Sequence, residues 1–121
     1  TEFQFEALHK AGVNVCLGTD SLATMRDGEA ELNMFAEMRD FCGKHPRVAP
    51  EEVAMMATVN GAAALGWQGV AGEISKGAFA DMIVLPITGG DVFSEIVNCA
   101  RKPIGVMVNG EWVVPPAQQE A

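Results

Sequence analysis

A short apolar segment, Val13 to Gly18, constrains the fold of this chain more than any other stretch. It is rich in β-branched and apolar residues, which predicts a strand buried on both faces, as the strands of parallel sheets are. A helix is predicted before it, over residues 2–11, because Phe5 and Leu8 share one helical face and Gly12 is placed to end the helix. Helix, glycine and buried strand follow one another in β/α proteins, so an α/β fold is predicted.

Three further helices are predicted after this strand. Asp27-Gly28-Glu29 opens a long helix to Gly43, whose narrow polar stripe leaves a wide apolar arc that expects contacts on more than one side. The next helix spans residues 50–57, since proline suits the first helical position. Thr58 is expected to cap a third helix, which ends at Gly66.

The pattern changes at Gly69 to glycines and short apolar runs, which predicts a β-rich second half. Glycines at 66, 69 and 72 predict turns, and Asn109-Gly110 is a strong hairpin signal. We therefore divide the chain into residues 1–68 and 69–121. The expected elements of the second half are strands over 82–85, 104–108 and 112–114 and a helix over 91–99.

Composition excludes several classes of function. The net charge is −8, with 16 acidic against 8 basic residues and no basic cluster, so binding to nucleic acid is not expected. No apolar run reaches the roughly 18–20 residues that span a bilayer, and residues 1–10 lack a signal-peptide core. Cys16, Cys42 and Cys99 lie far apart in apolar surroundings, which predicts buried, reduced thiols in a cytoplasmic protein.

Asp20 is the residue most suggestive of chemistry. It follows the carboxyl end of the predicted strand, where β/α proteins place their active sites. A carboxylate there can bind a metal ion or move a proton. Thr19 and Ser21 beside it add hydroxyl groups. The alternative is that Asp20 only caps the loop through backbone hydrogen bonds, and the spacing of residues does not decide between the two.

The remaining candidates favour structural roles. His9 and His45 have no metal-binding spacing and are expected at the surface or at helix boundaries, and no cysteine pair has CxxC spacing. Methionines at helical core positions are expected to pack rather than to bind a partner; these are Met34, Met38, Met55 and Met56.

Three ordered stretches resemble the C-terminal end of the amidohydrolase superfamily, in its deaminase/chlorohydrolase branch. Residues 13–23, VNVCLGTDSLA, with the helix that contains Glu37-Met38-Arg39, look like the eighth barrel strand and its helix. Residues 57–66 resemble the helical segment after the barrel. Residues 72–85 look like the return into a small β-sandwich, whose last strands carry a V-x-V-N-G segment, here Val106 to Gly110.

The resemblance implies the end of a (β/α)8 barrel followed by part of a β-sandwich, in a metal-dependent hydrolase of non-peptide C–N bonds. It implies that Asp20 binds or lies beside a divalent metal, with zinc first and iron or manganese as alternatives. Asp20 would accept a proton from the metal-activated water. Ser21 and Thr19 are candidates for orienting Asp20 or touching the substrate. The substrate implied is a small aminated heterocycle or nucleoside-like compound.

The chain departs from this family in what it lacks. The paired histidines of strand one, the histidines of strands five and six and the acid/base glutamate have no counterpart, and a full barrel needs about 250 residues. We therefore expect an inactive fragment of such an enzyme. The alternatives are a non-catalytic domain that self-associates through uncovered apolar surfaces, or an enzyme that acts as a chlorohydrolase or cyclic-amide hydrolase.

Overall fold

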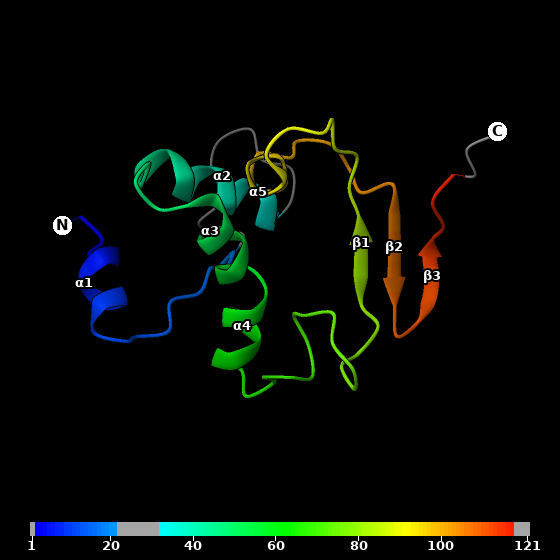
Figure 1. Ribbon diagram of the computed structural model, residues 1–121, viewed down its shortest axis with the longest axis horizontal. Helices are drawn as coiled ribbons and strands as arrows, with labels where there is room; N and C mark the ends of the chain where they lie inside the picture. The colour runs from blue at the N-terminus through cyan, green and yellow to red at the C-terminus, as the bar shows by residue number, and fades with distance from the viewer. Residues whose placement is uncertain (1, 22–31, 118–121) are drawn as a thin grey trace.

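The computed structural model describes residues 2–21 and 32–117 of the chain. Within these residues, five helices lie on one side and a three-stranded sheet on the other (Figure 1). Both element types are present, so the α/β class is confirmed. In chain order the elements are α1 (Phe5–Lys10), α2 (Met34–Lys44), α3 (Pro50–Met56), α4 (Val59–Ala64), β1 (Met82–Val84), α5 (Val92–Val97), β2 (Gly105–Val108) and β3 (Glu111–Val114).

Glycines end two of the helices, as predicted. Gly12 follows α1 with a φ of 73°, and Val13 N donates to Leu8 O at 3.0 Å. Gly66 follows α4 with a φ of 76°, and Trp67 N donates to Ala62 O at 2.8 Å. Both ends form the Schellman arrangement, in which a left-handed residue turns the chain and satisfies the last carbonyls.

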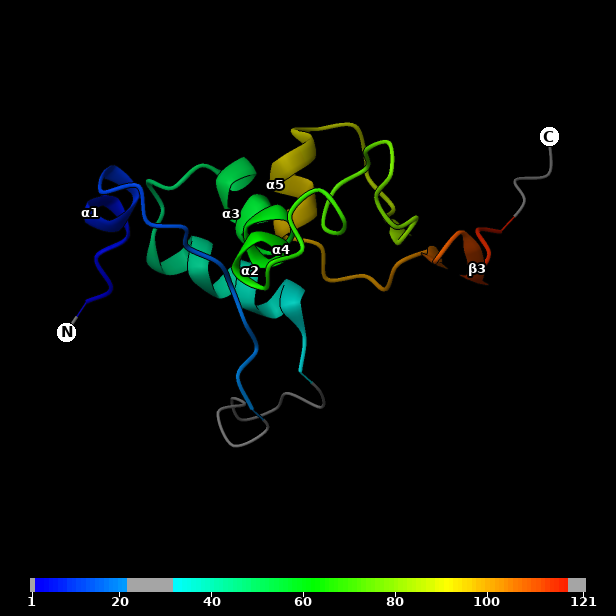
Figure 2. The same cartoon turned by 90° about the horizontal axis from the view of Figure 1, so that it is seen from below.

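The prediction of a strand over residues 13–18 is wrong for the described structure. The segment is extended but pairs with no strand in the described part of the chain. It lies against α3 instead, where Leu17 N donates to Met56 O at 3.0 Å. A strand needs a neighbour to hydrogen-bond with, and an apolar sequence alone does not supply one. Figure 2 shows this segment, in blue, running past the helices.

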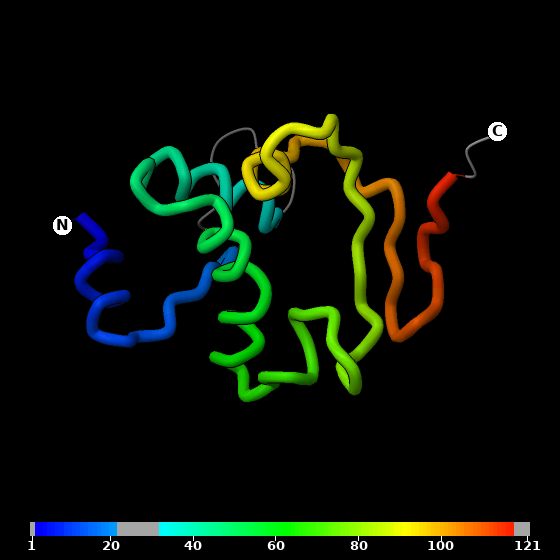
Figure 3. Tube along the Cα trace, in the orientation of Figure 1, coloured from blue at the N-terminus to red at the C-terminus, as the bar shows by residue number. Residues whose placement is uncertain are grey.

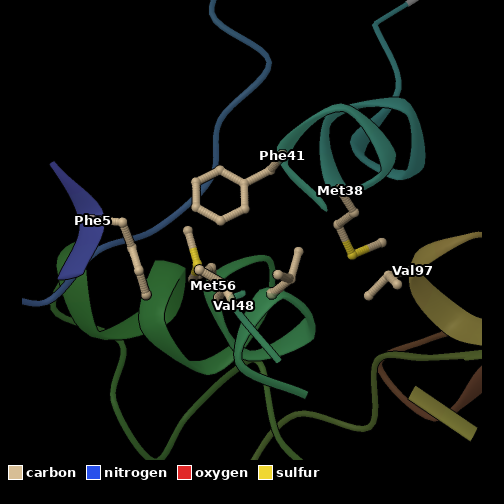
Figure 4. Packing of buried hydrophobic residues seen from close by; sticks show 7 residues of the cluster. Phe5, Met38, Phe41, Val48, Met56 and Val97 are labelled. Carbon is tan, nitrogen blue, oxygen red and sulfur yellow. The ribbon is translucent and has the colours of Figure 1, made fainter. Parts of the chain in front are cut away.

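The core lies among the helices and involves residues far apart in the sequence. Val53, Met56 and Val97 are almost completely buried, and α5 packs against both α2 and α3. Phe5 and Phe41 meet edge to face with ring centroids 5.7 Å apart, a geometry that aromatic pairs prefer. Burial of each such side chain contributes roughly 1.5–3 kcal/mol. The cluster consists of Phe5, Met38, Phe41, Val48, Val53, Met56 and Val97 (Figure 4).

Two predictions of burial are only partly right. Met38 and Met56 are buried and Met34 is half-buried, but Met55 is 42% exposed, because it lies on the outer side of α3 while Met56 faces the core. The prediction that all three cysteines are buried holds for Cys99 alone, since Cys42 is half-buried. Cys16 is exposed because nothing in the described residues covers that side of the extended segment. All three cysteines are free, as predicted.

Of the helix starts, that of α3 agrees with the prediction and that of α4 differs from it. Pro50 opens α3 as predicted, whereas Thr58 precedes α4 without a side-chain capping bond. Its hydroxyl donates to Ala54 O at 2.8 Å instead, a backward bond that threonine often makes. Asn33 caps α2 by accepting from Phe35 N at 2.9 Å. The predicted start of that helix at residues 27–29 lies outside the described residues.

The sheet has the order β1-β2-β3 with both pairs antiparallel. Asn109 and Gly110 have φ values of 49° and 81°, the two left-handed residues of a type I′ turn, so the predicted hairpin is confirmed. Asp81 Oδ1 accepts from Asn109 N at 2.7 Å and ties the turn to the start of β1. The trace in Figure 3 runs through β2, the hairpin and β3 at the far end from the N-terminus.

The predicted glycine turns are confirmed, and one of them is also tightly packed. Gly66, Gly69 and Gly72 all have φ near 76–78°. A Cβ on Gly72 would lie 2.7 Å from Thr58 O, whereas a Cβ on Gly69 would meet nothing within 4 Å. The backbone of Gly72 therefore approaches the start of α4 as closely as only glycine allows.

Gly72→Ala is expected to lower the free energy of unfolding more than Gly69→Ala does. Both variants place alanine at positive φ, which costs about 1–2 kcal/mol, but only Gly72→Ala adds a backbone clash. Urea denaturation of the two variants and of the parent chain measures the difference. Equal losses would show that the contact with Thr58 does not constrain the loop.

The connection from β1 to α5 is held by one carboxylate. Glu95 accepts from Thr88 N at 2.6 Å and from Gly90 N at 3.0 Å, and the Thr88 hydroxyl also donates to it. These hydrogen bonds from Thr88 lower the pKa of Glu95. Asp91 caps α5 by accepting from Ser94 N at 2.8 Å, and this hydrogen bond lowers the pKa of Asp91.

Replacing Glu95 by glutamine is expected to reduce stability at neutral pH, and the difference from the parent should shrink in acid. The folded pKa lies below the unfolded value, so the stabilisation is present above that value, about 4.3. It is lost as the pH falls through the lowered pKa. Denaturation curves from pH 7 downward measure this, with Glu73→Gln, an exposed carboxylate, as control. A difference that stays constant with pH would contradict the assignment.

Candidate functional site

Asp20 lies at the end of the extended segment, on the surface of the molecule. Its φ is 59°, in the left-handed region that non-glycine residues rarely occupy. Aspartate tolerates this conformation better than most residues, and such backbone outliers gather at functional sites. The carboxylate is exposed and has no hydrogen-bond partner among the described residues. Thr19 before it is half-buried, and Ser21 after it is exposed.

The segment that leads to Asp20 is supported from one side by α3 and α4. Asn14 Nδ2 donates to Asn60 O at 2.9 Å, and Asn60 Nδ2 donates to Val15 O at 3.0 Å. Val15 and Leu17 are half-buried and pack on the core cluster. The predicted site residue therefore lies just beyond an anchored segment, and the sequence patterns did not identify the two asparagines that anchor it.

An open hollow of about 330 Å³ lies between the extended segment and α2. Residues 15–18 form one wall, and Glu37 and Asp40 belong to the other. Lys44 Nζ is 2.6 Å from Asp40 Oδ2, so one of these acids is paired. The polar stripe predicted for the helix that the structure places at α2 thus borders this open hollow.

The residues present do not fit a complete metal site by themselves. In ranges 2–21 and 32–117 no group of three or more His, Cys, Asp or Glu side chains could hold a metal ion. Zinc sites use three or four protein ligands, and Asp20 provides one. Any metal site that includes Asp20 needs ligands from outside the described residues.

The histidines have the boundary roles that were predicted. His9 stacks on Phe5 with ring centroids 5.5 Å apart, and His9 Nε2 is 3.5 Å from Glu52 Oε1. The His45 ring lies against the Phe41 ring, with their centroids 4.5 Å apart. Neither joins Asp20 in a cluster of possible metal ligands within the described chain.

Two of the cysteines, Cys42 and Cys99, lie in the packed part of the structure. Burial raises the pKa of the Cys42 thiol, which keeps it protonated and unreactive. Cys99 is buried, and its backbone carbonyl accepts from Arg39 Nη1 at 2.7 Å. This contact joins α2 to the end of α5.

No helix in the described ranges is long and apolar enough to cross a bilayer. The longest, α2, has 11 residues, whereas a spanning helix needs about 20.

The named relatives that match this chain include deaminases of two descriptions. The chain is 45% identical over 83 residues to a 5-methylthioadenosine/S-adenosylhomocysteine deaminase of Acetivibrio thermocellus, covering 63% of this chain and 18% of the relative. It is 40% identical over 85 residues to a 5'-deoxyadenosine deaminase of Methanoregula boonei, covering 67% and 19%. The chain thus spans about a fifth of the length of these curated relatives.

A solved structure shares the fold. The crystal structure of a zinc-bound adenosine deaminase from Xanthomonas campestris superposes with a TM-score of 0.77 at 26% identity. The match covers 91% of this chain and 28% of the other. The arrangement of helices and hairpin described above is therefore that of one part of a larger enzyme structure.

The model of the amidohydrolase family matches residues 3–113, nearly the whole chain. The match includes the extended segment, Asp20, the helical region and the hairpin together. On this basis the chain belongs to the amidohydrolase family.

Proposed function

We propose that this chain is the C-terminal part of an amidohydrolase that deaminates a nucleoside-like substrate. The observation that carries the proposal is the family match over residues 3–113, combined with relatives named as deaminases of adenosine-type compounds. In such a reaction the oxygen of water adds to the ring carbon that bears the amino group. The C–N bond breaks, and the amino group leaves as ammonia.

The architecture proposed for the whole enzyme follows from the extended segment. Residues 13–18 would be the last strand of a (β/α)8 barrel, and their unpaired backbone would hydrogen-bond to neighbouring barrel strands. Residues 1–68 would form the end of the barrel with its trailing helices. Residues 69–121 would form part of a β-sandwich. The coverage supports a larger parent protein, because the matched part is only 18–28% of the relatives' lengths.

Asp20 is the residue we propose for the chemistry. It follows the strand-like segment, where barrel enzymes place functional groups. Its carboxylate is exposed, and its backbone is in the left-handed region. A carboxylate placed beside the attacking water can accept its proton and pass it to the leaving amine. Thr19 and Ser21 would orient Asp20 or contact the substrate.

A divalent metal, with zinc preferred over iron or manganese, is proposed for the intact enzyme. The Xanthomonas campestris relative was solved with bound zinc. The described residues of this chain hold no such site alone. Asp20 would therefore be one contributor to such a site.

Deamination is favoured over two alternatives. Chlorohydrolase or cyclic-amide hydrolase activity would use the same carboxylate, but the named relatives are deaminases. Large exposed apolar side chains, such as those of Ile74 and Leu65, favour the alternative of a self-associating domain. In a barrel enzyme part of that surface would instead be covered by the rest of the protein.

Asp20→Asn in the intact enzyme is expected to lower kcat for deamination of an adenosine-type nucleoside by about 10²- to 10⁴-fold, the usual contribution of a proton-transfer group. Asparagine keeps the size of the side chain and removes its ability to accept a proton. Ammonia release under saturating substrate measures the effect. Glu73→Gln, which removes an exposed carboxylate elsewhere, is the control and should keep parental activity. Near-parental kcat for Asp20→Asn would refute the assigned role.

The 121-residue chain by itself is expected to show no deaminase activity, and to bind zinc no more tightly than its Asp20→Ala variant. The reason is that the described residues form no group of three metal ligands. Isothermal titration with zinc and an ammonia-release assay on the purified chain make the test. Turnover by the isolated chain, or zinc affinity that depends on Asp20, would show that the site is more complete than we propose.

A further inference from the structure

Two asparagines clasp the extended segment to α4. The amide of Asn14 donates to the backbone carbonyl of Asn60 at 2.9 Å, and the amide of Asn60 donates back to the carbonyl of Val15 at 3.0 Å. Leu17 N adds a third hydrogen bond, to Met56 O at 3.0 Å. All three join the same short stretch of chain to the neighbouring helices α3 and α4.

Within the described residues no β-ladder holds the segment, so these bonds anchor it there. In the proposed enzyme they would act beside the barrel hydrogen bonds, which would join the segment to other strands and not to α4. The three bonds to α3 and α4 hold the side chain of Asn14 and the backbone at positions 15 and 17, which sets both the place of the segment along the helices and its rotation. Asp20 lies three residues beyond Leu17. At about 3.3 Å per extended residue, it is within about 10 Å of the last anchor.

We propose that Asn60, with Asn14 as its partner, is a positioning residue for Asp20. This inference rests on the function proposed for Asp20. A group that acts on a substrate has to be held within about 0.5 Å of its productive position, and a displacement of 1 Å can cost about 10²-fold in rate. A neutral amide suits this task, because it donates to a carbonyl without bringing a charge that titrates near the reacting group.

The pair differs from ordinary helix packing in what it connects. Asn60 lies in the first turn of α4, yet its side chain bonds to a residue 45 positions away, not to its own helix. Asn98 offers the contrast, since its amide donates to Ser94 O within α5 at 2.8 Å. Removing Asn98 deletes the same kind of bond without touching the segment that carries Asp20.

Amide hydrogen exchange in the 121-residue chain tests the clasp without any need for activity. In Asn60→Ala the Leu17 amide should exchange roughly 5- to 10-fold faster. The reason is that the segment then has about one hydrogen bond fewer to break when it opens locally. The His45 and Asn98 amides, which are bonded within α2 and at the end of α5, serve as internal references. They should change by less than roughly twofold, because their opening does not involve the clasp.

Three further variants sharpen the result. Asn60→Asp keeps the side-chain shape but removes the donor and places a carboxylate opposite the Val15 carbonyl. Exchange at Leu17 should therefore be at least as fast as in Asn60→Ala. Asn98→Ala should leave the Leu17 amide as in the parent. Asn14→Ala changes an exposed residue on the segment itself and should also speed exchange at Leu17. This last variant decides the matter if Asn60→Ala does not fold.

Kinetics of the intact enzyme provide a readout that a purely structural role would not move. Asn60→Ala should lower kcat by roughly 10- to 100-fold with little change in KM, because a misplaced carboxylate weakens the transition state more than substrate binding. Unchanged exchange at Leu17, equal acceleration at all three amides, or parental kcat in Asn60→Ala would each overturn the inference. If Asp20→Asn keeps activity while Leu17 still responds, the proposed function fails and the clasp itself stands.

Discussion

The burial of Val53 and Met56 on helix α3 is the interaction on which the rest of the structure depends. Both side chains are at most 1% exposed, and α3 contacts α2, α4 and α5. Through α5 it also joins the β-rich half of the chain to the helical half. Loss of either side chain would leave a cavity in contact with several elements at once, and such changes typically cost about 1–5 kcal/mol.

The candidate site depends on the same helix. Met56 is buried through its side chain, while its carbonyl accepts the amide of Leu17. Met56 thus contributes both to the core and to the support of the extended segment that leads to Asp20. The asparagines extend this support from α3 to α4. In the proposed enzyme the carboxylate of Asp20 would in this way be held by a rigid scaffold, as functional groups on loops are.

Several elements could be predicted because their causes are local. Gly12 and Gly66 end helices by adopting positive φ, and Asn109-Gly110 forms the turn that joins β2 to β3. The extended segment could not be predicted in the same way. Its apolar residues indicate burial, but pairing depends on a neighbouring strand that is absent from the described residues. Met55 and Cys16 are exposed for a related reason, since burial depends on what lies opposite.

The sequence by itself determined the α/β class, the turns and the place of Asp20 after an apolar segment, because these follow from backbone preferences and from residue order. The ordered motifs also pointed to the amidohydrolase family, to which the chain belongs. Only the tertiary structure decided how the segment is held. The bonds between Asn14, Asn60 and Val15 join positions about 45 residues apart, and side-chain amides at such separations carry no periodic signal. Their pairing arises only once the core has brought α4 beside the segment.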